Sequence, residues 1–489
     1  MRVPARLALL LAVVAFAGCT AAPHRQPPFA SMALETSDPA VTRCVELFRR
    51  TDEAVDAAGV RDGQTARIPG HPFLRADRWL ARLARQPGSD PVAIRAWMRR
   101  LDARARAAEL ANLPATALGA LASGAVGASP ASLAGELDAC GARLATLVGP
   151  DALARARVDD DYQTWKRWAG LYAFTRIPFS AGVRRYQRET EAVFATPLDA
   201  LAPAGRLERY GPPAGSAPPD MRLDALASGG EPAFEPLAAL AARHAPVFEI
   251  DTVSASDRIG QPRWAEGPRV SVDTTSPVMF VRLARTLFAG RVLPQIVYSV
   301  WFPERPRTGA LDLLGGNLDG ITWRVTLDLD GQPLAYDTIH NCGCYHQFFP
   351  TPRVRPRPGA GGLDEGAFIP QHLPAVTGED RVVLRIAAGT HALQRVSVVP
   401  RDAATHREVW LEQDDTLRSL SWPGGGRRSL FDADGIVPGS ERGERWLFWP
   451  MGVREPGAMR QWGRHATAFV GRRHFDDPDL IDRYFEPAR

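Results

Sequence analysis

The spacing of apolar residues changes across a Pro- and Gly-rich stretch, APAGRLERYGPPAGSAPPD, at residues 202–220. Before it, the chain is rich in Ala, Leu and Arg, and residues such as Ile94, Met98 and Leu101 recur at the spacing of a helix face. After it come short β-favouring runs bounded by turn residues. This order predicts an α+β protein, in which an N-terminal helical domain precedes a mainly antiparallel β domain that is sandwich or barrel-like.

Three local signals make this prediction specific. Asp330-Gly331 lies between the alternating segments WRVTLDL and QPLAYDTI and predicts a β-hairpin. The segment PFLRADRWLARL, residues 72–83, opens with a proline and is expected to be helical. The stretch at 202–220 is itself predicted to be a linker or a long surface loop.

The first residues, MRVPARLALLLAVVAFAGCT, combine a positive start with an apolar run too short to span a membrane as a stable helix. Such a segment is typical of an export signal. The ending Ala17-Gly18-Cys19 resembles the lipobox of bacterial lipoprotein precursors, although Phe16 stands where leucine is usual. The resemblance implies cleavage after Gly18 and acylation of Cys19. The alternative is a plain secretory peptide cleaved nearby.

The same resemblance implies a location. Thr20, and not aspartate, follows the cysteine, which implies an outer-membrane lipoprotein facing the periplasm, with the cell surface as an alternative. Two or three acyl chains on Cys19 would anchor the protein stably. The predicted organisation is a signal peptide at 1–18, a lipidated tether at 19–40, a helical domain at 41–200, a linker at 201–232, a mainly β domain at 233–456 and an Arg/His-rich segment at 457–489.

Composition narrows the possible partners. Hydrophobic residues make up 45% and charged residues 23% of the chain, as in globular proteins. The formal charge of +4 falls to +2 once Arg2 and Arg6 leave with the signal peptide, which is too balanced to indicate a nucleic-acid partner. The expected partner is a membrane, reached through the lipid anchor, while protein and small-molecule partners stay unassigned.

Cysteine positions predict one disulfide. Of five cysteines, Cys19 is assigned to lipid, and the remaining four would face an oxidising compartment. Cys44 lies on an apolar helical stripe with Phe48, and Cys140 on another with Leu144. Both stripes should face a core, which favours a Cys44–Cys140 disulfide. Two separate buried thiols are the alternative.

The segment HNCGCYH carries His340, Cys342, Cys344 and His346 at every second position. Two thiolates with an imidazole suit Zn(II) or Cu(I), provided that Gly343 lets the backbone fold back. The other interpretations are a C-G-C redox pair, which would close a small and easily reduced ring, and a purely structural bridge or pair of thiols.

A second group of candidates lies near the C-terminus in GAMRQWGRHATAFVGRRHFDDPDL. Arginines there would bind an anion and a histidine would move a proton near neutral pH. His391 could join such a site from another loop, whereas ordinary arginine–aspartate surface pairs are the alternative. The candidate residues are His391, Arg460, Arg464, His465, Arg473 and His474.

One more segment, residues 161–189, interleaves aromatic and basic side chains and either lies against anionic lipid or packs into the core. Together these features predict a lipid-anchored cell-envelope protein that acts as a binding or scaffold module, with the HNCGCYH loop as a candidate transition-metal site. The alternative function is a periplasmic hydrolase or thiol-redox enzyme with a His/Arg anion-binding site.

Overall fold

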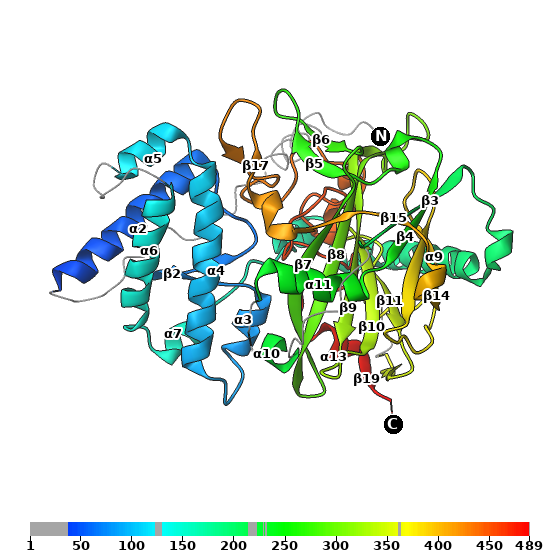
Figure 1. Cartoon of the computed structure of the whole chain (residues 1–489), viewed down its shortest axis with the longest axis horizontal. Coiled ribbons are helices and arrows are strands. Elements are labelled where there is room, and N and C mark those ends of the chain that lie inside the picture. Colours follow the sequence, from blue (N-terminus) through cyan, green and yellow to red (C-terminus); the bar gives the residue numbers. More distant parts are fainter. Residues whose placement is uncertain are drawn as a thin grey trace, which may run out of the picture.

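The structure is a computed structural model that describes residues 38–122, 130–213, 223–227, 229, 232–359 and 363–488. Cys19, the predicted signal peptide and the tether up to residue 37 lie outside the described residues. A helical part stands beside a larger β part (Figure 1), which confirms the predicted α+β class. None of the described helices combines the length and apolar character that crossing a bilayer requires.

The helical part has its own apolar core. The two longest of its helices, α2 and α4, begin after Asp38 and Asp90, whose carboxylates accept the N–H groups of Ala40 and Val92, and each helix starts with a proline. Its elements are α2 (Pro39–Ala58), β1 (Ala66–Ile68), β2 (His71–Ala76), α3 (Arg78–Leu83), α4 (Pro91–Asn112), α5 (Ala115–Ala122), α6 (Pro130–Ala145) and α7 (Pro150–Ala154).

The predicted disulfide is confirmed. Cys44 on α2 and Cys140 on α6 are bonded, with Cα atoms 5.2 Å apart. Both cysteines are buried in the core that the two helices share with α4 and β2. The two apolar stripes therefore meet as their periodicity predicted.

The prediction of one helix over residues 72–83 is wrong in its first half. His71–Ala76 is strand β2, paired antiparallel with β1, and Asp77 caps the short helix α3 by accepting the Leu80 N–H. Arg75, in the strand, is fully buried and forms ion pairs with Asp102 and Glu109 of α4. Both partners of Arg75 come from α4, so local helix propensity does not show that this segment is extended.

Six strands form the larger sheet, in the order β11-β10-β9-β8-β7-β16. Neighbours are antiparallel except β16, which runs parallel to β7. The hairpin predicted at Asp330-Gly331 joins β9 to β10, and Gly331 has a φ of 81°. The strands are β7 (Val278–Phe288), β8 (Arg291–Arg305), β9 (Gly316–Leu327), β10 (Pro333–His340), β11 (Gln347–Pro350) and β16 (Trp410–Gln413).

A second sheet of five strands has the order β14-β13-β4-β3-β15. Its apolar residues share one core with those of the larger sheet, so the described residues form an open sandwich. The strands are β3 (Arg206–Gly211), β4 (Val247–Thr252), β13 (Asp380–Ile386), β14 (Leu393–Pro400) and β15 (Arg407–Glu408), with α10 (Leu223–Ala227) and α11 (Phe234–His244) between β3 and β4.

Part of the predicted linker at residues 201–232 is a strand of the second sheet. Residues 206–211 form strand β3 between β4 and β15, and Tyr210 is buried in the shared core. The Asp251 carboxylate of β4 accepts the N–H groups of Ala204 and Gly205 and so holds the start of the strand. Pairing with a neighbouring strand overrides the Pro- and Gly-rich composition on either side of β3.

Two helices connect the helical part to the β part. They are α8 (Thr164–Ala169) and α9 (Tyr172–Ala195), which pack on η5 (Trp449–Met451), and α9 also contacts β14. The C-terminal segment is mostly irregular and largely buried from Gly457 to Val470, and it ends in α13 (Leu480–Tyr484) and β19 (Phe485–Pro487). Other short strands and helices are β5 (Gln261–Trp264), β6 (Val270–Asp273), β12 (Val354–Pro356), β17 (Leu420–Ser421), β18 (Arg427–Arg428) and α12 (Arg445–Phe448).

Candidate functional site

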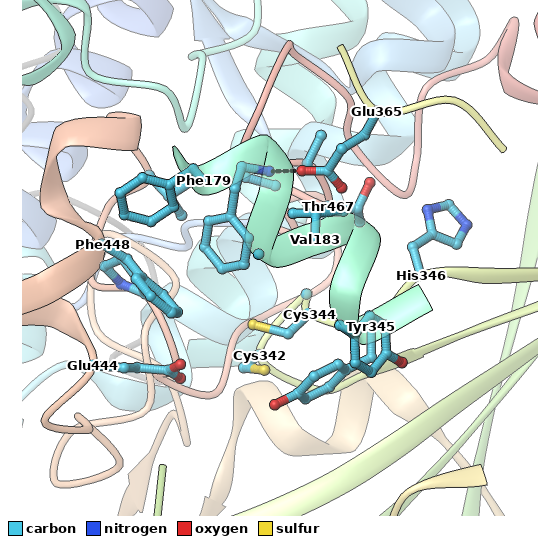
Figure 2. A pocket seen from close by; sticks show the side chains of 18 of the residues that line it. Phe179, Val183, Cys342, Cys344, Tyr345, His346, Glu365, Glu444, Phe448 and Thr467 are labelled. Carbon is cyan, nitrogen blue, oxygen red and sulfur yellow. Dashed lines mark hydrogen bonds between the residues drawn. The ribbon is translucent and has the colours of Figure 1, made fainter. Parts of the chain in front are cut away.

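A cavity of about 480 Å³ lies between helix α9, the HNCGCYH turn and the segments around residues 444–457 and 466–473 (Figure 2). We call it the α9 pocket. Its volume falls within the range of about 300–1,000 Å³ that is usual for small-molecule sites. Most of its lining is apolar, and the aromatic and aliphatic residues include Phe179, Val183, Phe368, Phe448, Val453 and Phe469.

The HNCGCYH turn forms part of the pocket wall. It connects β10 to β11 and folds back tightly, because the His340 N–H donates to the Cys344 carbonyl at 3.0 Å and the Gly343 N–H donates to the His340 carbonyl at 2.7 Å. Gly343 has a φ of 90°, and a Cβ there would lie 2.7 Å from the Ala466 carbonyl oxygen. Only glycine fits this position, as the sequence predicted for a fold-back.

The turn brings the two cysteines together. Cys342 is buried, Cys344 is half-buried, both are free thiols, and both line the α9 pocket. A hydrogen bond from the Cys344 thiol, helped by the charge of Arg442, lowers the pKa of Cys342, and the same hydrogen bond and burial raise the pKa of Cys344. The pair therefore releases its first proton more readily than its second.

A carboxyl group, Glu444, lies beside the thiols in Figure 2. Burial raises the pKa of Glu444 to about 7, against the opposing effect of Arg442. Its side chain packs on Gly457, where a Cβ would lie 2.0 Å from a carboxyl oxygen. Glu444 can therefore accept or release a proton near neutral pH inside an apolar pocket.

The two histidines of the predicted metal site, of which one was expected to join the two thiolates, have other partners. The Nε2 atom of His346 lies 2.9 Å from Asp337, and the Nδ1 atom of His340 lies 3.5 Å from Asp319. Each histidine is thus held by a different buried carboxylate of the larger sheet. Across the part of the chain that the structure describes, no group of three or more His, Cys, Asp or Glu side chains is placed to hold a metal ion. Zn(II) or Cu(I) binding by these residues stays a prediction that the observed contacts do not favour.

Asp319 is the centre of a buried polar cluster behind the turn. Its carboxylate is 2.9 Å from His391 Nδ1, 3.5 Å from His340 Nδ1 and 3.2 Å from Arg442 Nη2. Despite burial, Arg442 and the two histidines hold the pKa of Asp319 well below its usual range. This cluster fixes His340, at the start of the turn, to the centre of the sheet.

Tyrosines separate the α9 pocket from a second cavity of about 360 Å³. Tyr186 of α9 and Tyr345 of the turn line both cavities, and their rings lie 5.1 Å apart. Tyr345 has a φ of 61°, a left-handed backbone conformation that is uncommon for a residue other than glycine. The turn therefore presents its thiols to one cavity and His340 to the other.

The predicted anion-binding arginines are occupied by the protein itself. Arg460 is buried and donates to the backbone carbonyls of Cys342, Arg464 and Glu455. Arg464 donates to the Asp434 carbonyl and lies 3.6 Å from a carboxylate oxygen of Asp161. Arg473 lines the α9 pocket but donates to the carbonyls of Gly366 and Thr467.

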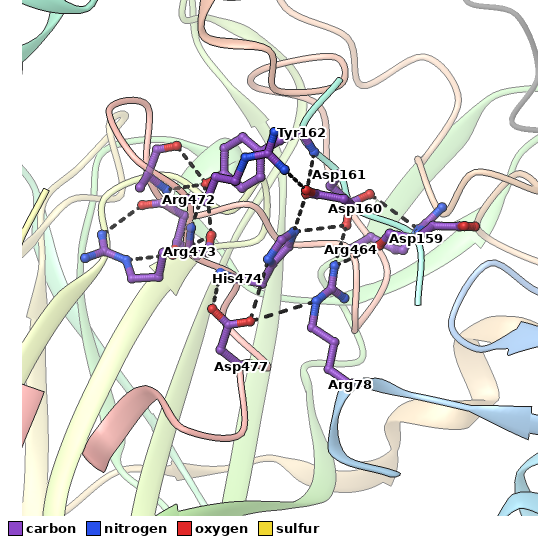
Figure 3. A network of polar contacts seen from close by, with 12 residues as sticks. Arg78, Asp159, Asp160, Asp161, Tyr162, Arg464, Arg472, Arg473, His474 and Asp477 are labelled. Carbon is purple, nitrogen blue, oxygen red and sulfur yellow. Dashed lines mark hydrogen bonds and ion pairs between the residues drawn. The ribbon is translucent and has the colours of Figure 1, made fainter. Parts of the chain in front are cut away.

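His474 belongs to a network that joins distant parts of the chain (Figure 3). Its imidazole is 3.4 Å from Asp160 and 3.7 Å from Asp477, and its ring contacts Tyr162 edge-on. Arg78 of α3 reaches the same network through Asp161 at 3.3 Å. This network links the helical part to the C-terminal segment.

The three candidate histidines have separate surroundings. His391 lies between Asp319 and Asp257, His474 lies in the network of Figure 3, and His465 lines a small cavity with Trp301 and Arg460. The anion-binding and catalytic role of these residues stays a prediction that the observed contacts do not favour.

The free energy of unfolding should fall as the pH drops from roughly 7 to 5, and in His465→Asn this fall should be smaller by about 2 kcal/mol. Burial lowers the pKa of His465 to about 3, below its ordinary value of 6.5. The unfolded chain therefore binds a proton below pH 6.5 that the folded chain does not bind, so stability falls as the pH drops. Urea denaturation of both proteins at the two pH values measures the difference, and equal losses would contradict a neutral buried His465.

The sequence did not identify Glu444 or the pocket-lining residues of α9 as functional. The α9 residues belong to the mixed aromatic and basic segment at 161–189, for which two interpretations were open, whereas nothing in the sequence indicated Glu444. Phe179 and Tyr186 of that segment face the pocket, whereas Trp168 and Phe174 are 83% and 71% exposed. Comparison of the chain with protein-family models, with curated proteins and with solved structures finds no match.

Proposed function

We propose that the chain is an exported, lipid-anchored cell-envelope protein that binds a small, uncharged apolar molecule in the α9 pocket. The observation that carries this proposal is the pocket itself, which is large enough for a ligand and lined mainly by apolar side chains. Its polar groups are few, and Glu444 is half neutral near pH 7. An anionic ligand group at that end of the pocket would be repelled by the ionised form of Glu444.

An exposed apolar surface beside the pocket supports this ligand class. Leu447 is 57% exposed and also lines the pocket, and Phe179 and Phe448 pack at 5.5 Å near it. Exposed aromatic and aliphatic residues concentrated in one region mark interaction sites more often than chance would produce. The exposed residues are Trp165 and Trp168 on α8, Leu171 between α8 and α9, Phe174 and Ile177 on α9, and Trp446 and Leu447 on α12.

Anchoring is the second component of the proposal. Acylated Cys19 would hold the described residues near a bilayer, where apolar ligands concentrate. The outer membrane, facing the periplasm, is the proposed location. Incorporation of labelled palmitate into the wild type, and its absence from Cys19→Ser, tests this component; equal labelling of the two would contradict it.

Replacing Gly182 by tryptophan is expected to weaken apolar-ligand binding by roughly tenfold or more, because about 1.4 kcal/mol of lost contact suffices for that change. Gly182 lines the pocket from α9, and no atom lies within 4 Å of the position that a Cβ would take. Gly182 is exposed, and the open space around it leaves room for an indole, which is expected to reach over the pocket that this residue lines. Fluorescence titration with the neutral probe N-phenyl-1-naphthylamine measures the affinity.

The matched control is Ala181→Trp. Ala181 is the preceding residue of the same helix and is exposed. It does not belong to the residues that line the pocket. Its replacement should leave the affinity for the probe unchanged, and equal binding by both variants and the wild type would refute ligand binding in the α9 pocket.

A further inference from the structure

We propose that Cys342 and Cys344 form a redox-active dithiol that exchanges reversibly with an uncharged organic disulfide entering the α9 pocket. This inference goes beyond the binding of an apolar molecule and does not rest on it. It uses the two sulfur atoms and their neighbours, whereas the binding proposal uses the apolar walls. Each can fail without the other.

The first support is the position of the two sulfurs. Cys342 and Cys344 are two residues apart in a turn closed by backbone hydrogen bonds between His340 and the residues that follow it. Their sulfur atoms lie close together in Figure 2, and each thiol shifts the pKa of the other. Formation of a disulfide therefore needs little movement of the chain.

The second support is the rigidity of the turn. Arg460 Nε donates to the Cys342 carbonyl at 3.0 Å, and Gly343 packs against the Ala466 carbonyl. A disulfide between residues so near in sequence departs from the preferred geometry and is more easily reduced than a structural bridge. A rigid turn that already holds the thiols in contact would partly offset this and permit cycling between the two states.

The third support is the contrast with the other cysteine pair. Cys44 and Cys140 are bonded inside the apolar core of the helical part. Cys342 and Cys344 instead line a cavity, and Cys344 is the more exposed of the two. Cys342 is buried among apolar residues, but it also lines the cavity. A thiol that lines a cavity can meet a small molecule that enters the cavity, whereas a cysteine enclosed in a packed core cannot.

In the first half of the exchange, Glu444 carries the proton. The Cys342 thiol passes its proton to the Glu444 carboxylate, and the thiolate attacks one sulfur of R–S–S–R. The Cys342–S–R bond forms, the substrate S–S bond breaks, and the released R–S⁻ takes the proton from Glu444. The substrate disulfide accepts the electron pair, and no further oxidant is required.

The second half of the exchange completes the cycle. The Cys344 thiol passes its proton to Glu444 and its sulfur attacks Cys342. The Cys342–Cys344 disulfide forms and the second R–S⁻ leaves, taking the proton back. The net reaction converts the protein dithiol and one R–S–S–R into the protein disulfide and two R–SH, and it runs in reverse when thiols are in excess.

The test follows the reaction of the full-length, prereduced protein with bis(2-hydroxyethyl) disulfide. Mass spectrometry should show an internal disulfide in the peptide that contains Cys342 and Cys344. In Cys344→Ser the reaction should stop at the mixed disulfide on Cys342, and Cys342→Ser should react roughly tenfold more slowly or worse. A wild-type pair that stays fully reduced in excess probe would overturn the proposal.

A measurement on the wild type alone avoids the risk that a variant misfolds. In mixtures of reduced and oxidised dithiothreitol, the Cys342–Cys344 pair should change between states reversibly while Cys44–Cys140 stays bonded. A pair that is reduced only together with Cys44–Cys140 would be structural, and the proposal would be wrong. The same holds if the pair never oxidises.

Glu444 has its own test. Glu444→Gln should slow the exchange and remove the change in its rate near pH 7, while Glu444→Asp should restore part of both. The final ratio of dithiol to disulfide should stay the same in all three proteins, because a proton carrier changes the rate and not the equilibrium. An unchanged pH profile in Glu444→Gln would exclude Glu444 from the exchange.

Discussion

Replacing Arg324 by methionine should lower the free energy of unfolding by about 3–5 kcal/mol. Arg324 in β9 and Asp337 in β10 are both almost completely buried, and Arg324 Nε donates to Asp337 Oδ1 at 2.9 Å. The guanidinium also donates to the Phe475 carbonyl and stacks on the Phe475 ring at 3.8 Å. Methionine would fill part of this space but would leave the carboxylate without its cation.

The reason for so large an effect is the charge that remains. Burial disfavours the charged form of Asp337, yet Arg324 and His346 hold its pKa below the usual value. Without Arg324, either the carboxylate stays charged in a poorly solvating interior or it takes up a proton, and both cost free energy. His346 would also lose the fixed partner that orients it toward the HNCGCYH turn. Urea denaturation followed by circular dichroism measures the change.

The control for this prediction is Arg185→Met. Arg185 pairs with Glu189 at 2.8 Å on the surface of α9, where the two side chains are 77% and 63% exposed. Its replacement should leave the stability almost unchanged. Adding Asp337→Leu to Arg324→Met should recover part of the loss, since no buried charge is left unpaired. A single Arg324→Met variant as stable as the surface control would contradict the argument.

Removing the disulfide with Cys44→Ala and Cys140→Ala should cost about 2–5 kcal/mol. The two cysteines are 96 residues apart in sequence, so the bridge closes a long loop and restricts the unfolded chain strongly. It also ties α2 to α6, the two helices that carry the apolar stripes of the helical part. Thermal unfolding of the two proteins measures the loss.

A reductant provides the matched comparison. The folded core shields the bridge, but during heating dithiothreitol reaches it as the chain unfolds. The reductant should therefore destabilise the wild type by about as much as the double substitution does, and it should leave the double variant unaffected. Cys342 and Cys344 are free thiols in this structure, so in prereduced protein a reductant has no bond to break at this pair. A wild type whose unfolding temperature does not respond to the reductant would contradict a stabilising role for the bridge.

Local sequence patterns predicted a substantial part of the fold. The change from helical to alternating periodicity near residue 202, the hairpin at Asp330-Gly331 and the pairing of Cys44 with Cys140 are all confirmed. Each depends on residues whose own spacing or turn chemistry sets the outcome. A helix stripe shows which side faces a core, even when the partner of that side is unknown.

The errors occurred where partners distant in sequence decided the structure. Residues 206–211 became a strand because β4 and β15 pair with it, and residues 71–76 became a strand whose Arg75 meets carboxylates of α4. The metal site at HNCGCYH stays untested, but its histidines contact Asp319 and Asp337, which the sequence did not indicate. Side-chain alternation within seven residues does not show which carboxylates the neighbouring strands present.

The sequence by itself therefore determined the α+β class, the disulfide and the need for glycine at position 343, because periodicity and backbone conformation are local properties. It also predicts an export signal and an acylated Cys19, which lie outside the described residues. Only the tertiary structure decided that Cys342, Cys344 and Glu444 face one apolar pocket with α9 as a wall. A pocket forms between segments more than a hundred residues apart, and their convergence depends on how whole elements pack.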